Sequence, residues 1–98
     1  MEVHSNLIYI LLNKALCVYK YGSVVYGTYK PGISDTDYIA VVPDDVLKET
    51  AQFENGNDQY TFYTVSEWQK MLDDNNVAAV ECRFLDKQFI VKETVDFP

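Results

Sequence analysis

The stretch Tyr21–Val42, YGSVVYGTYKPGISDTDYIAVV, holds the strongest structural signal in this sequence. Its last part, Tyr38–Val42, is an apolar run that follows Asp35 and Asp37 and ends at Pro43. Such a run predicts a strand that begins near Asp37. Side chains at positions i and i+2 of a strand lie on one face, so the two carboxylates would project together, about 6–7 Å apart.

Two carboxylates at this spacing repel each other unless a cation lies between them. Mg²⁺ prefers oxygen ligands, and two such ions about 3.5–4 Å apart recur in sites of phosphoryl transfer. We therefore interpret Asp35 and Asp37 as ligands of Mg²⁺ or Mn²⁺ rather than as acids.

The pair Gly22 and Ser23 precedes Asp35 by eleven intervening residues, 24–34. A glycine at the end of a strand lets a phosphate approach backbone N–H groups, and Ser23 adds a hydroxyl donor. A helical turn over residues 23–28 would add its positive dipole end. A Gly-Ser turn or an Asp-x-Asp alone is common, but together and in this order they indicate a phosphate and metal site.

These residues resemble the nucleotidyltransferases related to DNA polymerase β, whose signature is Gly-Ser followed some ten residues later by Asp-x-Asp or Asp-x-Glu. Four residues match that signature: Gly22, Ser23, Asp35 and Asp37. The longer pattern is similar to that of a prokaryotic and phage subgroup of predicted or RNA-repair-associated nucleotidyltransferases. Gly27 and Ser34 fill the additional positions of that pattern. The resemblance extends over roughly residues 5–86.

The resemblance implies a minimal nucleotidyltransferase fold of the α/β (α+β) class, with helices packed against a small mixed sheet of three to four strands. It also implies transfer of NMP from an NTP, ATP by default, to a hydroxyl of a protein, an RNA or a small molecule, with release of pyrophosphate. Four residues would bind the nucleotide: Gly22, Ser23, Gly27 and Ser34. The metals would be held by Asp35, Asp37 and a third carboxylate, Asp58. Alternatively, Asp58 simply begins a strand after a turn.

Glu81 follows Asn76 in a region where the subgroup carries an Asn and then a Glu. A helix over residues 77–84 would place it on one face with apolar residues. A carboxylate on such a face needs a partner, so Glu81 either binds the backbone or Arg83 or contacts the substrate pocket.

Composition limits the classes of partner. The chain has 98 residues, 48% of them apolar, which predicts a single domain over residues 1–98. The net charge of −7, with eight basic residues, disfavours nucleic-acid binding by this chain alone. The apolar run Leu7–Leu12 is too short to span a bilayer and lacks a basic leader, so we expect a cytoplasmic protein that does not enter a membrane. A homodimer or hetero-complex is compatible with an open sheet edge.

The spacing of Cys17 and Cys82 argues against a zinc site and predicts reduced core residues. The remaining pattern predicts helices over residues 4–16, 44–48, 66–72 and 77–84, and strands over residues 17–21, 37–42, 59–65 and 88–91. Ser66 and Gln69 fit a capping box at the third of these helices.

Two other classes of function stay open. The chain could be a catalytically inactive binding or inhibitory protein of phage or toxin–antitoxin type that keeps the fold. It could also be a structural domain of a larger assembly in which the motif is incidental.

Overall fold

The structure is a computed structural model that describes residues 3–22, 27 and 36–93. Side chains are described from Asn6 onward. The helical elements of this part of the chain are α1 (Val3–Lys14), α3 (Val65–Asp73), α4 (Val77–Cys82) and the 3₁₀ helix η1 (Lys87–Phe89). The strands are β1 (Cys17–Tyr21), β2 (Thr36–Val42), β3 (Ala51–Asn55), β4 (Asp58–Thr64) and β5 (Ile90–Glu93).

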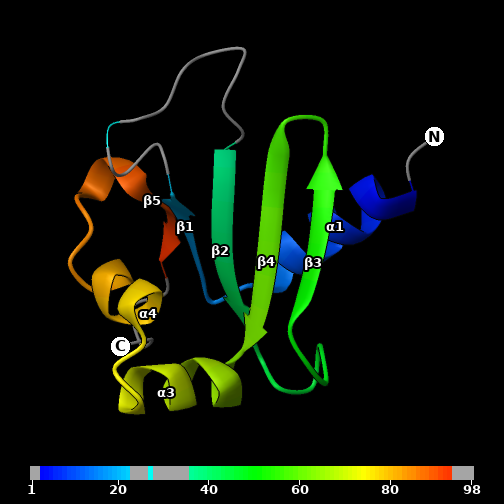
Figure 1. Ribbon diagram of the computed structural model, residues 1–98. Coiled ribbons are helices and arrows are strands. Elements are labelled where there is room, and N and C mark those ends of the chain that lie inside the picture. Colours follow the sequence, from blue (N-terminus) through cyan, green and yellow to red (C-terminus); the bar gives the residue numbers. More distant parts are fainter. Residues whose placement is uncertain (1–2, 23–26, 28–35, 94–98) are drawn as a thin grey trace.

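The strands form one mixed sheet in the order β3-β4-β2-β1-β5 (Figure 1). The central pair, β2 and β4, is parallel, and Thr36 of β2 lies opposite Asp58 of β4. Every other pairing in the described sheet is antiparallel. Because β2 lies between β1 and β4, the residues at its start have a neighbour on each side.

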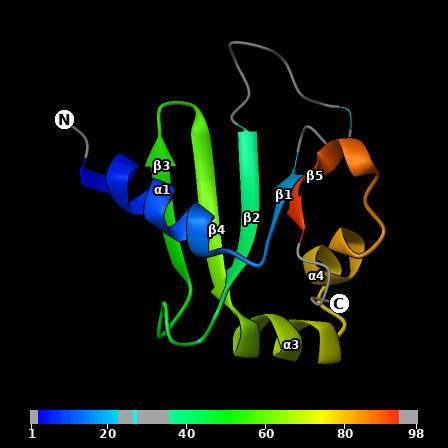
Figure 2. The same ribbon diagram turned by 180° about the vertical axis from the view of Figure 1, so that it is seen from behind.

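Helix α1 covers one face of the sheet, as Figure 2 shows most clearly. Its buried residues Ile8 and Leu11 pack in one core cluster with Val18, Ala40 and Phe62 of the strands. Lys92 of β5 donates hydrogen bonds of 3.2 and 3.0 Å to the last carbonyls of α1, which satisfies groups that a helix end leaves unpaired. Within the described residues, the helices are too short or too polar to cross a membrane.

Helices α3 and α4 pack against the other face of the sheet. The core cluster on this side contains residues from two strands, β1 and β2, and from both helices: Cys17, Tyr19, Ile39, Val41, Trp68, Ala79 and Cys82. Trp68 of α3 contacts the rings of Tyr63 and Tyr19, with centroids 5.6 and 6.5 Å away. Both cysteines are free and buried, as the sequence predicted.

The fold class is confirmed, and the sheet has five strands instead of three to four. The strand that sequence reasoning missed is β3, which pairs with β4 around a turn at Gly56. It lies at the edge of the sheet, so its side chains stay exposed or half-buried and give a weak apolar pattern. The last strand begins at Ile90 and not at residue 88, because residues 87–89 form η1.

The predicted short helix over residues 44–48 is wrong, because these residues form turns and bends. Asp44 instead accepts two hydrogen bonds from Ser66, one of 2.9 Å from the backbone N–H of Ser66 and one from the Ser66 hydroxyl. The capping box of α3 is also two residues earlier than predicted: Thr64 is the N-cap and Glu67 is its partner. Ser66 and Gln69 are therefore exposed residues within the helix.

Helix α4 is shorter than predicted and presents a different face to the core. It ends at Cys82, and the side chains buried beneath it are Ala79 and Cys82. Val77 and Phe84, the two apolar ends of the helix predicted over residues 77–84, are 68% and 81% exposed. Asn76 caps the helix by accepting a 3.2 Å hydrogen bond from the N–H of Ala79.

Candidate functional site

Gly22 follows the last residue of β1 and lies against Asp37 of β2. Its φ of +77° is a left-handed conformation that residues with a Cβ rarely adopt. A Cβ built on Gly22 would overlap Oδ2 of Asp37. Glycine therefore adopts the left-handed backbone angle of this turn and leaves the Asp37 carboxylate in place. The sequence motif thus brings two of its four residues into direct proximity.

Asp37 has a neighbour from the sheet on each side. It pairs with Tyr21 in the antiparallel ladder with β1 and with Gln59 in the parallel ladder with β4. Its side chain is half-buried, and strand alternation places it on the same face as Ile39, which belongs to the core beneath α3 and α4. The carboxylate therefore lies at the end of the sheet, on the face that those helices partly cover.

The rest of the predicted nucleotide-binding set lies largely outside the described residues. Ser23, Ser34 and Asp35 belong to the segments that the structure does not describe. Gly27 is described as an exposed turn residue with φ +77°. The roles of these four residues remain predictions.

Asp58 lies at the same end of the sheet as Asp37 but on the opposite face. It pairs with Thr36, one position before Asp37 in the parallel ladder. Along β4, alternation groups Asp58 with Tyr60, whose ring stacks on Tyr38 with the centroids 4.8 Å apart. Both rings pack against the α1 cluster. Burial, followed by the charge of Asp58, raises the pKa of Tyr60, which agrees with this grouping.

Glu81 of α4 is connected to the site through Tyr21. The hydroxyl of Tyr21 donates a hydrogen bond of 2.6 Å to Oε1 of Glu81, and both side chains are half-buried. Since Tyr21 is the cross-strand partner of Asp37 and precedes Gly22, the bond links α4 to the glycine turn. Sequence reasoning selected Glu81 but not Tyr21, because the two residues lie 60 positions apart.

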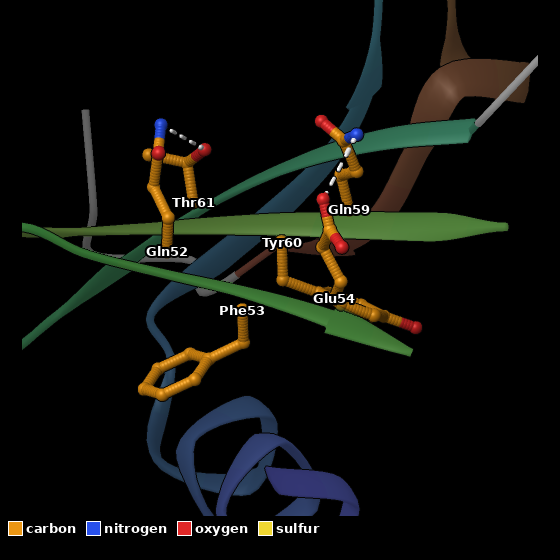
Figure 3. A pocket seen from close by; sticks show the side chains of 6 residues that line it. All are labelled: Gln52, Phe53, Glu54, Gln59, Tyr60 and Thr61. Atoms are coloured by element: carbon orange, nitrogen blue, oxygen red, sulfur yellow. Dashed lines mark hydrogen bonds between the residues drawn. The ribbon is translucent and has the colours of Figure 1, made fainter. Parts of the chain in front are cut away.

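The face of the sheet that carries Asp37 continues over β4 and β3. Four polar side chains project from this face, and together they form a shallow pocket of about 340 Å³ with the backbone between them (Figure 3). These side chains are Gln52, Glu54, Gln59 and Thr61. Phe53 and Tyr60 lie on the other side of the strands, toward α1 (Figure 3). Nothing in the linear pattern distinguished Gln59, which register alone places beside Asp37.

The chemistry of these donors suits a hard divalent cation. Carboxylate oxygens are preferred ligands of Mg²⁺, and Asp37 presents one beside the glycine turn. Among the residues that the structure describes, no group of three or more His, Cys, Asp or Glu side chains is close enough to hold a metal. Asp35, the second predicted ligand, is not among these residues.

The family-model comparison agrees with the glycine turn and the aspartate strand. The model of the nucleotidyltransferase domain matches residues 12–96 of this chain. The chain therefore belongs to the nucleotidyltransferase domain family. Neither a curated protein nor a solved structure matches it.

Proposed function

We propose that this chain is a metal-dependent nucleotidyltransferase that moves an NMP group from an NTP to a hydroxyl acceptor and releases pyrophosphate. The observation that carries the proposal is the packing of Gly22 against Asp37, within a chain of the nucleotidyltransferase family. Family membership supports the class of reaction. The glycine turn supports the place where the phosphates and the metal would meet.

Each motif residue has a role in this proposal. Asp35 and Asp37 hold Mg²⁺ or Mn²⁺, which when bound offsets the negative charge of the phosphates. The backbone at Gly22 and the hydroxyl of Ser23 donate hydrogen bonds to the triphosphate. Gly27 and Ser34 complete the loop around it.

We propose a protein or a small molecule as the acceptor, in preference to RNA. The chain carries 15 acidic and eight basic residues, so it repels a polyanion unless a partner supplies the basic surface. ATP is the default donor, and the cytoplasm of a prokaryote or of a phage-infected host is the proposed location.

The test is incubation of the purified chain with each α-³²P-labelled NTP and Mg²⁺ or Mn²⁺, alone and with cell lysate. Asp35→Asn and Asp37→Asn should each abolish label transfer. Asp45→Asn provides a matched control, because it removes the same charge from an exposed turn after β2. Circular dichroism melts establish that each variant is folded. Transfer retained by both folded motif variants would refute the assignment.

The same experiment addresses the alternative function. Absence of transfer from the unaltered chain, with labelled nucleotide still bound, would indicate an inactive binding protein that acts through protein contacts. Such a protein should keep its partner after both aspartate substitutions.

A further inference from the structure

Gln59 occupies the position on β4 directly beside Asp37. The parallel ladder pairs these two residues, and neighbouring strands lie about 4.8 Å apart. Paired residues of adjacent strands project to the same face of a sheet. An amide and a carboxylate are therefore next to each other at the end where the glycine turn lies.

The faces of β4 are fixed by the aromatic residues further along the strand. Tyr63 contacts Trp68 of α3, so alternation places Thr61 and Gln59 on the same face as α3. Phe62 is fully buried in the α1 cluster, and Asp58 falls on that side. Figure 3 shows the separation directly: Gln59 and Thr61 project away from α1, whereas Tyr60 lies toward it.

The side chain of Gln59 is exposed and able to reach a ligand. Its Nε2 donates to Oε1 of Glu54 at 3.5 Å, the long limit of a hydrogen bond. Gln59 also lines the shallow pocket over β3 and β4.

We infer that Gln59, and not Asp58, is the residue of β4 that contacts the ligand bound at Asp37. The inference rests on the proposed metal and nucleotide site. A glutamine contributes a neutral carbonyl oxygen and an N–H donor, so this chain places a neutral side chain where a carboxylate would add negative charge. The site therefore binds a divalent cation with one negative charge fewer than a site that has a third carboxylate.

The test is a Mn²⁺ titration followed by electron paramagnetic resonance, without nucleotide and without turnover. Gln59→Glu adds one carboxylate beside Asp37 and should strengthen Mn²⁺ binding about tenfold, equivalent to about 1.4 kcal/mol. Asp58→Asn, the neighbouring residue on the other face, should leave the affinity within about twofold. Asp37→Asn should weaken binding at least about tenfold. Thermal melts establish that each variant is folded.

Two results would overturn the inference. One is weakening by Asp58→Asn, and the other is an unchanged affinity in folded Gln59→Glu while Asp37→Asn still loses Mn²⁺. Unchanged binding in Asp37→Asn would refute the proposed metal site itself, and the role of Gln59 with it. The label-transfer assay remains a separate test of the reaction, so failure of the chemistry is distinguished from failure of this contact.

Discussion

Tyr21 and Glu81 join the end of β1 to α4 through a hydrogen bond of 2.6 Å between residues 60 positions apart. The bond brings the carboxylate of Glu81, on the face of the sheet covered by α3 and α4, close to the glycine turn. Tyr21 also pairs with Asp37, so the two side chains project from neighbouring strands on the same face of the sheet. The position of the Tyr21 ring should therefore depend on Glu81.

Tyr21→Phe should lower the free energy of unfolding by about 1–2 kcal/mol, because it removes a half-buried hydrogen bond to a charged acceptor. Glu81→Gln should cost a similar amount, and the double variant should cost less than the sum of the two. Urea denaturation of all four proteins measures the coupling. Tyr9→Phe is the matched control, since Tyr9 is 68% exposed. Strict additivity would show that the bond contributes nothing to stability.

Glu67 should make stability depend on pH in the acid range. Burial raises its pKa, but hydrogen bonds from Thr50 and Thr64 outweigh this effect and lower the pKa below the ordinary value of 4.5. Because the pKa is lower in the folded chain, the carboxylate stabilises the fold above pH 4.5. That stabilisation is lost as the pH falls from 4.5 through the folded-state pKa.

Glu67→Gln should therefore show a flatter decline in the free energy of unfolding between about pH 6 and about pH 3 than the unaltered chain. Urea titrations at each pH provide the measurement. Glu49→Gln removes an exposed carboxylate and should leave the slope almost unchanged. Parallel curves for Glu67→Gln and the unaltered chain would contradict the role of this cap.

The two cysteines should resist thiol reagents in the folded protein. Burial raises the pKa of Cys17 to about 11 and that of Cys82 to about 12, so almost no thiolate forms at pH 8. Ellman's reagent should label neither until denaturant unfolds the chain, and then both. The variant Gln88→Cys, which has a cysteine at an exposed position, is the positive control. Rapid labelling of two thiols in the folded state would be incompatible with the packed cluster beneath α3 and α4.

The elements with strong local patterns were predicted well. The strand after Asp37 was assigned from its apolar run alone, and the structure extends it by a single residue to Thr36. In contrast, β3 has only one covered face and lies at an edge, so its pattern was too weak to detect. Local sequence is informative only where burial makes the pattern strong.

The start of α3 illustrates a different limit. Two overlapping capping patterns fit the sequence, Thr64 with Glu67 and Ser66 with Gln69. Contacts from elsewhere in the chain support the first: Thr50 bonds to Glu67, and Asp44 bonds to Ser66. Such contacts have no local signature, so the sequence alone could not distinguish the two caps.

The part of the candidate site that lies within the sequence motif was predictable. The part that depends on how the strands pair was not. Gly22 and Asp37 were paired by their spacing, and the structure places them in contact. Asp58 and Gln59 are adjacent in sequence but lie on opposite faces, and a carboxylate was the obvious choice for a metal site. A shift of one residue moves every side chain of a strand to the other face.

Substitution at Gly22 should separate backbone strain from steric overlap at the site. Gly22 and Gly56 both have positive φ, +77° and +63°, but only at Gly22 would a Cβ meet a neighbour, Oδ2 of Asp37. Gly56→Ala should therefore lower the free energy of unfolding by about 1 kcal/mol, the cost of the left-handed conformation. Gly22→Ala should cost at least about 1 kcal/mol more. In an Asp37→Ala background this excess should disappear, because the overlapping carboxylate is gone. Equal costs for both glycines in urea denaturation would mean that Asp37 does not lie against the turn.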